Sequence, residues 1–244
     1  MSILKNFYDR TSSRFWDPLA GLIGRDLQIF PLISNGQGTL LEYGFGSGSL
    51  LFTIAQRCDY SKVIGIDISD VVIERAYENL AAVEEEWPSK IELSLSQEEK
   101  IVHIPDESVD VAVSVATLEH VLDVYTVLDE LHRVTKPGGV LICSVPNYVY
   151  LKYRLQILFG RLPITGTNKP IEQWREAGWD GMHIHTFTRA ALDTLLRDCG
   201  WQPAQWTGWG TKASWLLRLR QKFPQLLSGE LIVMSKRVSH PHAK

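Results

Sequence analysis

The sequence predicts an α/β fold in which a mostly parallel, seven-stranded sheet carries helices on both faces. From about residue 39, short runs rich in β-branched residues alternate with segments whose apolar residues recur at helical spacing. This alternation is typical of βαβ units. A glycine-rich turn also follows the first such run and opens the first helical segment. We therefore expect one α/β domain over residues 1–244.

Seven segments have the composition of strands. The strongest is 109–115, which is β-branched and almost continuously apolar. Short apolar runs of this kind, bounded by turn residues, are typical of strands buried on both faces. We expect strands at 39–43, 62–67, 90–95, 109–115, 140–145, 201–206 and 230–236.

Capping residues and apolar spacing predict the helices between these strands. Ser69 and Thr188 each precede a helical period and can accept a backbone hydrogen bond as N-caps. Gly200 then ends the second of these helices. A third helix is expected to stop at residues 136–139, because the proline and glycines there cannot continue it. The buried face of the helix after Ser69 is expected to hold Ile73, Ala76, Tyr77 and Leu80.

Composition argues against several classes of protein. Of 244 residues, 45% are hydrophobic and 22% charged, as in ordinary soluble domains. The balance of 25 basic against 28 acidic residues argues against a nucleic-acid binder. Three separated cysteines with no CxxC pair indicate neither a disulfide framework nor a zinc cluster. No secretory leader or long apolar run is visible, so we expect a cytoplasmic protein.

The glycine-rich turn is the most informative local signal. Glycines 44, 46 and 48 follow Glu42 at the end of the first strand and permit positive φ angles close to a ligand. Backbone N–H groups at the start of the next helix can then face a polar ligand. A GxGxxG/A dinucleotide turn needs glycine or alanine at position 49, where this chain has Ser49. The glycines are therefore interpreted first as a turn that binds a polar ligand other than a dinucleotide. An NAD-linked oxidoreductase is a weaker alternative, and an ordinary tight turn is the other.

Asp67 ends the second strand, on the same edge of the sheet as the glycine turn. Open α/β sheets bind ligands at this edge, and a carboxylate there can accept hydrogen bonds from a ribose diol. The alternative is a carboxylate that only stabilises the N-terminus of the next helix.

Four segments in this order resemble class I S-adenosylmethionine-dependent methyltransferases: LLEYGFGSGSL (40–50), VIGIDIS (63–69), IPDESVDVAVSVATLEHV (104–121) and LHRVTKPGGVLICSVPN (131–147). The TLEHV and SVPN segments are more loosely similar to ubiquinone-pathway O-methyltransferases. Residues 158–165 and 183–201 are similar to a methyltransferase group associated with methionine biosynthesis. The resemblance implies a Rossmann-like, doubly wound sheet and S-adenosylmethionine as cofactor.

The resemblance also implies a role for each matching position. The methionine part of the cofactor is expected to lie beside Glu42 and the three glycines, Gly44, Gly46 and Gly48, and to face Val115 and Ala116. Asp67 is expected to hold the ribose, Ile68 to flank the adenine, and Ser96 and Gln97 to lie near its amine. Tyr8 and Arg14 are expected to close over the cofactor, with a packing or solvated helix as the alternative.

The order of the predicted elements divides the domain into four parts. These are an N-terminal helical lead (1–38), a cofactor-binding core (39–146), a substrate-side insert (147–187) and the C-terminal part of the sheet (188–244).

Methyl transfer to a hydroxyl needs a base, and histidine titrates near neutral pH. The candidate bases are His120, His183 and His185. Glu119 and His120 could instead only cap the next helix. His183 and His185 would share one face of a strand, where they could also pack or bind a metal. The ubiquinone-type enzymes have an acidic residue where this chain has Ala116, so we expect no metal.

The insert and the C-terminal part are rich in aromatic and basic residues. Trp174 and Trp179 are expected to form an aromatic wall over the substrate. Segments 148–159 and 215–223 mix apolar and basic residues, most simply as amphipathic helices whose basic side chains snorkel to solvent. A rim for an acidic substrate and a shallow membrane contact are the less favoured alternatives.

The expected function is methyl transfer to a small-molecule acceptor, at oxygen rather than nitrogen or carbon. The alternative from another class is a cofactor-binding protein with a methyltransferase fold that modulates another enzyme. Nothing in the sequence names the acceptor or the oligomeric state.

Overall fold

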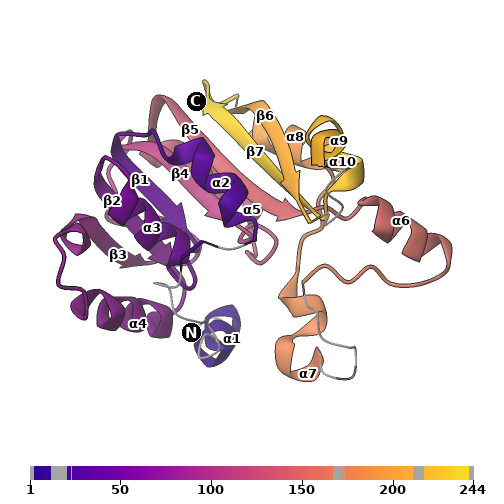
Figure 1. Ribbon diagram of the computed structural model, residues 1–244, viewed down its shortest axis with the longest axis horizontal. Coiled ribbons are helices and arrows are strands. Elements are labelled where there is room, and N and C mark those ends of the chain that lie inside the picture. The colour runs from indigo at the N-terminus through magenta and orange to yellow at the C-terminus, as the bar shows by residue number, and fades with distance from the viewer. Residues whose placement is uncertain are drawn as a thin grey trace.

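The computed structural model describes residues 3–11, 21–22, 24–166, 172, 174–210 and 217–241. Within them, seven strands form one sheet in the order β3-β2-β1-β4-β5-β7-β6 (Figure 1). Neighbouring strands from β3 to β5 pair in parallel, and β7 runs antiparallel to both β5 and β6. The predicted mostly parallel, seven-stranded sheet is therefore confirmed. The strands are β1 (Gly38–Tyr43), β2 (Tyr60–Asp67), β3 (Ile91–Leu95), β4 (Val109–Val115), β5 (Thr135–Pro146), β6 (Trp201–Trp209) and β7 (Glu230–Arg237).

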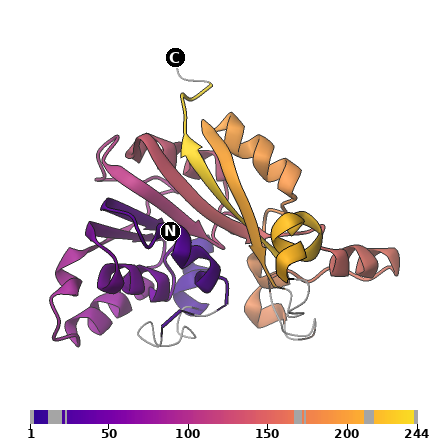
Figure 2. The ribbon, with the colours of Figure 1, turned by 45° about the horizontal axis from the view of Figure 1, so that its top comes forward.

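Helices cover both faces of this sheet (Figures 1 and 2). One core holds α2 (Asp26–Ile33), α3 (Ser49–Arg57) and α4 (Asp70–Ala81), and the other holds α5 (Val124–Val134) and α8 (Arg189–Asp198). Successive side chains of a strand point to opposite faces. Leu40 therefore packs with the first core, and Leu41 packs with the second.

The predicted N-caps are both present. The Ser69 hydroxyl accepts a hydrogen bond from the Val72 amide at 3.3 Å, and the Thr188 hydroxyl accepts one from the Ala191 amide at 3.1 Å. Each bond satisfies a backbone donor that the first turn of a helix leaves without a partner. Helices α4 and α8 accordingly begin directly after these caps.

The expected burial of Tyr77 was wrong, and the boundary between α5 and β5 differs slightly from the prediction. Tyr77 is 49% exposed and its hydroxyl donates to the Leu93 carbonyl, while Val72 joins the buried face of α4. The helix that was expected to stop at residues 136–139 ends slightly earlier, at Val134, and residues 136–139 belong to β5. A register shift in the pairing of β4 with β5 accommodates the glycines at the start of β5.

The insert forms an irregular extension of the sheet, as expected. Its two ends are joined, because the Tyr148 amide donates to the Phe187 carbonyl at 2.9 Å. Figure 1 shows its helices α6 and α7 projecting away from the sheet. The described part of the insert contains α6 (Leu151–Leu158), α7 (Trp174–Ala177) and the 3₁₀ helix η5 (Trp179–Met182).

Short helices complete the chain. They are α1 (Ile3–Thr11) in the N-terminal lead, the 3₁₀ helix η3 (Trp87–Lys90) before β3, and α9 (Leu217–Lys222) and α10 (Pro224–Leu227) between β6 and β7. None of the helices in the described residues is long and apolar enough to cross a membrane.

Candidate active site

A cavity of about 1220 Å³ lies along the edge where β1, β2, β4 and β5 end. Its lining includes Tyr43, Asp67, Val115 and Pro146, each the last residue of its strand or next to it, together with Glu230 at the start of antiparallel β7. Open α/β sheets bind ligands at this edge. A pocket for one drug-sized ligand holds about 300–1,000 Å³. This cavity therefore has room for a cofactor and a second small molecule.

The glycine turn forms the floor of the cavity, and all three glycines have positive φ angles. At Gly44, a Cβ atom would lie 2.3 Å from the Thr117 hydroxyl. At Gly46, with φ of +53°, a Cβ atom would project into open space. Both line the cavity, whereas Gly48 does not and instead precedes α3. A side chain at position 46 would therefore occupy space that a ligand can use.

The carboxylate of Asp67 is fixed at the cavity wall by two backbone amides. One oxygen accepts from the Gly46 amide and the other from the Ser69 amide, each at 3.0 Å. Burial raises the pKa of Asp67, and these amides oppose that rise. Each carboxylate oxygen has a second lone pair, so both can still accept a bond from a diol. The neighbouring Ile68 also lines the cavity.

Glu42 is a buried acid with an open hydrogen-bonding position. Its side chain is 3% exposed and lines the cavity, and one carboxyl oxygen has no partner among the described residues. Burial raises its pKa well above the ordinary value, and the charges of Asp26 and Asp67 add to the rise. A buried polar atom without a partner is costly, so a ligand that bonds to it or brings positive charge is favoured here.

Only some of the remaining predicted cofactor residues line the cavity. Val115, Ala116 and Tyr8 line it. Ser96 and Gln97 do not, because the Ser96 hydroxyl bonds to that of Tyr43 and the Gln97 backbone pairs with Lys100. Glu99 lines the cavity instead. Arg14 lies outside the described residues.

The end of the insert folds back onto the loop after β4. The amides of Ile184 and His185 both donate to the Glu119 carbonyl, at 2.7 and 3.1 Å. This brings the rings of His120 and His183 to 4.7 Å between centroids, and both line the cavity. His185 does not line it. Residues 183–186 form no strand, so the expectation that His183 and His185 share one face was wrong.

Hydrogen bonds fix the tautomer of both cavity histidines. The Thr165 hydroxyl donates to the Asp180 carboxylate at 2.8 Å, so its oxygen accepts from Nδ1 of His183, also at 2.8 Å. Nδ1 of His120 lies 3.1 Å from the Met182 carbonyl, which can only accept. In a neutral imidazole, one nitrogen donates and the other accepts. Each Nε2 therefore carries a lone pair.

Glu119 completes this group. Its side chain is 1% exposed, neither carboxyl oxygen has a partner among the described residues, and one lies 3.9 Å from Nε2 of His183. Burial raises the pKa of Glu119 to about 8 and lowers that of His120 to about 4. Burial also lowers the pKa of His183. At neutral pH the group therefore holds a protonated acid and two neutral imidazoles.

Glu119 and His120 do not cap α5, because the Asp123 side chain accepts from the first amides of that helix. In the described part of the chain, Glu119, His120 and His183 also form a possible metal-binding group. Their potential ligand atoms lie within 4.8 Å of one another. The charge of Arg25 acts on all three. A nearby cation and a protonated acid both disfavour a metal ion here.

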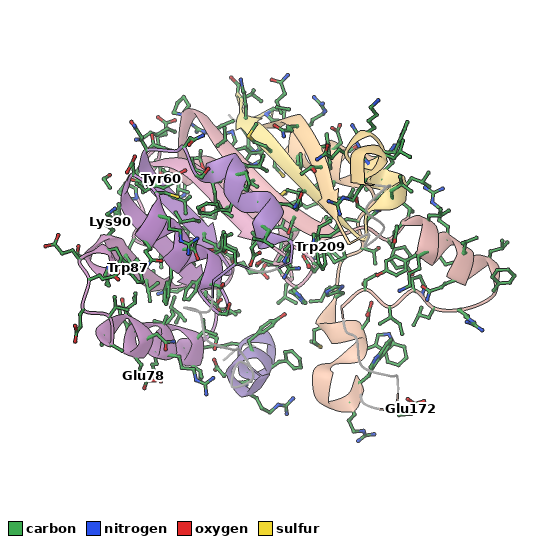
Figure 3. All side chains as sticks on the ribbon, in the orientation of Figure 1. Tyr60, Glu78, Trp87, Lys90, Glu172 and Trp209 are labelled. Atoms are coloured by element: carbon green, nitrogen blue, oxygen red, sulfur yellow. The ribbon has the colours of Figure 1, made fainter. Side chains whose placement is uncertain are left out.

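Several cavity residues had no signal in the sequence. Arg25 pairs with Glu230 at 3.2 Å across a separation of 205 residues, and Ser144 donates to the same carboxylate. The aromatic lining also differs from the expected wall. Trp174 is buried against Trp179, and neither lines the cavity. Trp209 at the end of β6, labelled in Figure 3, does line it. Tyr150 and Tyr153 line it as well.

The fold and this edge of the sheet define a class of protein. Residues 41–143 match the family described as a methyltransferase domain. This match and the relatives below show that residues 41–143 form a methyltransferase domain similar to those of S-adenosylmethionine-dependent methyltransferases. The resemblance seen in the sequence is thereby confirmed.

Two curated relatives are similar to part of the chain. The ubiquinone/menaquinone biosynthesis C-methyltransferase of Geotalea daltonii is 30% identical over 53% of this chain and 56% of its own length. The human mitochondrial ubiquinone biosynthesis O-methyltransferase is 30% identical over 56% of this chain and 36% of its own length. The chain thus matches only about a third to a half of these relatives.

Solved structures show the same fold over most of the chain. A Haloferax volcanii methyltransferase, solved with a methyltransferase activator, has a TM-score of 0.65 at 16% identity, covering 98% of this chain and all of its own. The geranyl diphosphate C-methyltransferase of Streptomyces coelicolor has a TM-score of 0.62 at 12% identity, covering 88% of this chain and 78% of its own.

S-adenosylmethionine is the cofactor of this class, and the cavity fits it. The open space over Gly46 admits a ligand close to the backbone. Asp67 retains acceptors for a diol, and the open position on Glu42 suits a cationic ligand. Because of these three features, the cavity can accommodate S-adenosylmethionine.

Proposed function

We propose that this protein transfers the methyl group of S-adenosylmethionine to a hydroxyl oxygen of a small-molecule acceptor, with His183 taking the proton. One observation carries the proposal. Two imidazoles with Nε2 lone pairs lie in the cavity beside the cofactor edge, and burial lowers the pKa of both so that they are unprotonated at neutral pH. A hydroxyl acceptor needs such a base, whereas a neutral amine does not need one before it attacks.

When bound, S-adenosylmethionine supplies a methyl group on a sulfonium that is already a good electrophile. The chain has to place the acceptor oxygen in line with that methyl group and to take up its proton. Positioning in a closed cavity can contribute up to about 7–11 kcal/mol. A base in reach adds roughly 10²–10⁴-fold. The acceptor O–H proton would pass to Nε2 of His183 as the oxygen bonds to the methyl carbon, while the electron pair of the methyl–sulfur bond would remain on sulfur.

The bonds around His183 support this role. Once Nε2 is protonated, the ring is cationic, and its Nδ1–H still donates to Thr165, whose hydroxyl donates to the Asp180 carboxylate. Asp180 also accepts from the backbone amides of Thr165 and Gly166 at 2.9 Å, which holds the chain of bonds in place. An anion at the end of this chain stabilises the imidazolium. His120 is the second base candidate, and His185, outside the cavity lining, has no such role.

The lining near this base suits an acceptor with an apolar or planar body. Tyr150, Tyr153, Ile164 and Trp209 contribute apolar surface on the side of the insert. A pocket with a mostly apolar lining and a few placed polar groups is typical of small-molecule sites.

The test is transfer of a labelled methyl group to a panel of hydroxy, amino and carbon-acid compounds. We expect label in the ether products. His183→Asn should lower turnover by about 100-fold or more while binding of the cofactor persists. The matched control is His103→Asn, at an exposed histidine outside the cavity lining. Label on nitrogen or carbon would contradict oxygen as the acceptor atom. Cofactor binding with no transfer to any class would indicate a partner protein without turnover.

A further inference from the structure

Helix α6 and the turn after it present an uncovered apolar surface. Six apolar side chains there are 40–75% exposed, and no residue of α6 is buried. Single exposed apolar residues are ordinary, but a contiguous group on one element marks an interaction site. We call this group the apolar ridge: Leu151, Leu155, Ile157, Leu158, Phe159 and Leu162.

The charged residues of the segment that carries the ridge are all basic. Residues 147–166 contain Lys152, Arg154 and Arg161 and no aspartate or glutamate, in a chain whose net charge is −3. All three cations are exposed. Apolar side chains flanked by lysine and arginine are typical of helices that lie in the interface of an anionic membrane. Long basic side chains can keep their charge at the headgroups while their stems follow the apolar surface.

A second element at the same end of the molecule has the same character. The Asn147 side chain donates to the carbonyls of Gln225 and Ser228, at 2.9 and 2.7 Å, which ties the base of the insert to α10. Figures 1 and 2 both place α9 and α10 at the end from which α6 projects. Leu219 and Phe223 are 41% and 48% exposed there. Residues 199–229 again contain no acidic residue.

We propose that the apolar ridge docks on the surface of an anionic phospholipid bilayer. Leu158 and Phe159, the most exposed of its side chains at 73% and 75%, enter the acyl boundary. Arg154 and Arg161 pair with lipid phosphates. Charge complementarity selects this occupant, because a partner with an uncharged apolar face would leave three cations unmatched.

The ridge adjoins the cavity without being part of it. Tyr153 of α6 lines the cavity, whereas Leu151, Leu155 and Leu158 recur at helical spacing and do not line it. Lys152 is exposed and also lines the cavity, so it lies at the rim. Docking would therefore bring the cavity rim to the headgroup level. Lipid binding is independent of methyl transfer and can be measured without an acceptor.

The test is co-sedimentation of the full chain with vesicles of phosphatidylcholine alone or mixed with phosphatidylglycerol. We expect binding to the mixed vesicles only, weakening as salt is added. The Leu158→Glu/Phe159→Glu variant should lose binding. Arg154→Gln/Arg161→Gln should weaken it about 25-fold, since each surface cation contributes about fivefold.

Matched controls separate the ridge from general effects. Tyr125→Glu replaces an exposed apolar side chain on α5, and Arg57→Gln/Arg75→Gln removes two exposed cations elsewhere. Both should bind vesicles like the parent protein. Retained calorimetric binding of S-adenosylmethionine shows that each ridge variant is folded.

Two results would overturn the proposal. One is equal sedimentation of the parent protein with mixed and neutral vesicles. The other is a dimer in light scattering that Leu158→Glu/Phe159→Glu converts to a monomer, with no vesicle binding by either form, which would assign the ridge to a second copy of this chain.

Discussion

Replacing Glu119 with glutamine should stabilise the protein at neutral pH. Glu119 is 1% exposed, and burial raises the pKa of its carboxyl from 4.5 to about 8, with Glu230 adding to the rise and Arg25 opposing it. In the unfolded chain the carboxyl ionises near its ordinary pKa, whereas in the folded protein it stays protonated. Its contribution to stability is therefore fully present below pH 4.5 and is lost as pH rises towards about 8.

The size of the effect follows from the linkage between proton binding and folding. Between the two pKa values, the cost of keeping Glu119 protonated grows by about 1.4 kcal/mol per pH unit and reaches roughly 3 kcal/mol at pH 7. Glutamine has nearly the same shape and does not ionise in either state. Glu119→Gln should therefore raise the free energy of unfolding by about 3 kcal/mol at pH 7 and change it little at pH 4.

The assay is urea unfolding, monitored by tryptophan fluorescence from about pH 4 to about pH 8. The control is Glu78→Gln. Glu78 is exposed on α4 (Figure 3), so its replacement should stay within about 0.5 kcal/mol of the parent protein. The stability curves of the parent protein and Glu119→Gln should converge at acid pH and separate above it. Parallel curves would refute the reasoning, because they would mean that Glu119 is ionised in the folded protein.

Four further results are expected. Burial lowers the pKa of His183 below its ordinary 6.5, so its base form persists as pH falls. The acid limb of the kcat/KM profile should therefore lie below pH 6.5. An acid limb above pH 6.5 would exclude His183 as the buried base. Chelation should leave turnover unchanged, because Arg25 and protonated Glu119 disfavour a metal; loss of activity restored by a divalent ion would contradict this. Gly46→Val should abolish cofactor binding in calorimetry, because a side chain there enters the cavity from a positive-φ position, and unchanged affinity would remove the glycine turn from the site. Asp123→Ala should destabilise the protein by about 1 kcal/mol in thermal unfolding through loss of the α5 N-cap, and an unaltered melting temperature would contradict that capping role.

Local signals in the sequence predicted that the glycine turn and Asp67 come together at one edge of the sheet. The glycine turn and Asp67 each lie at the end of a strand, and parallel strands bring their carboxyl ends to one edge. Strand and turn composition therefore placed them together without knowledge of distant contacts. Ser96 and Gln97, which the resemblance placed near the adenine amine, do not line the cavity, and the Ser96 hydroxyl bonds to that of Tyr43.

Contacts between segments that are distant in the sequence determine the positions of the residues around His183. His183 reaches the group with Glu119 only because amides of the irregular insert bond to the loop after β4. Neither helical nor strand periodicity extends through that insert, so its path had no sequence signal. The pairing of Arg25 with Glu230 joins the lead to the last strand, and no local pattern could indicate it. Glycines 138 and 139 were expected to end the preceding helix, yet they belong to β5 at a register shift in its pairing with β4.

The most direct test of the central claim is calorimetric titration of the protein with S-adenosylmethionine and its demethylated product, with NAD as the parallel control. Saturable binding of both sulfur ligands with affinity of roughly micromolar order, lost in Asp67→Ala, is the result expected from a cavity built on Gly46, Asp67 and Glu42. No binding of either ligand, or saturable binding of NAD instead, would contradict the assignment of this cavity to methyl transfer.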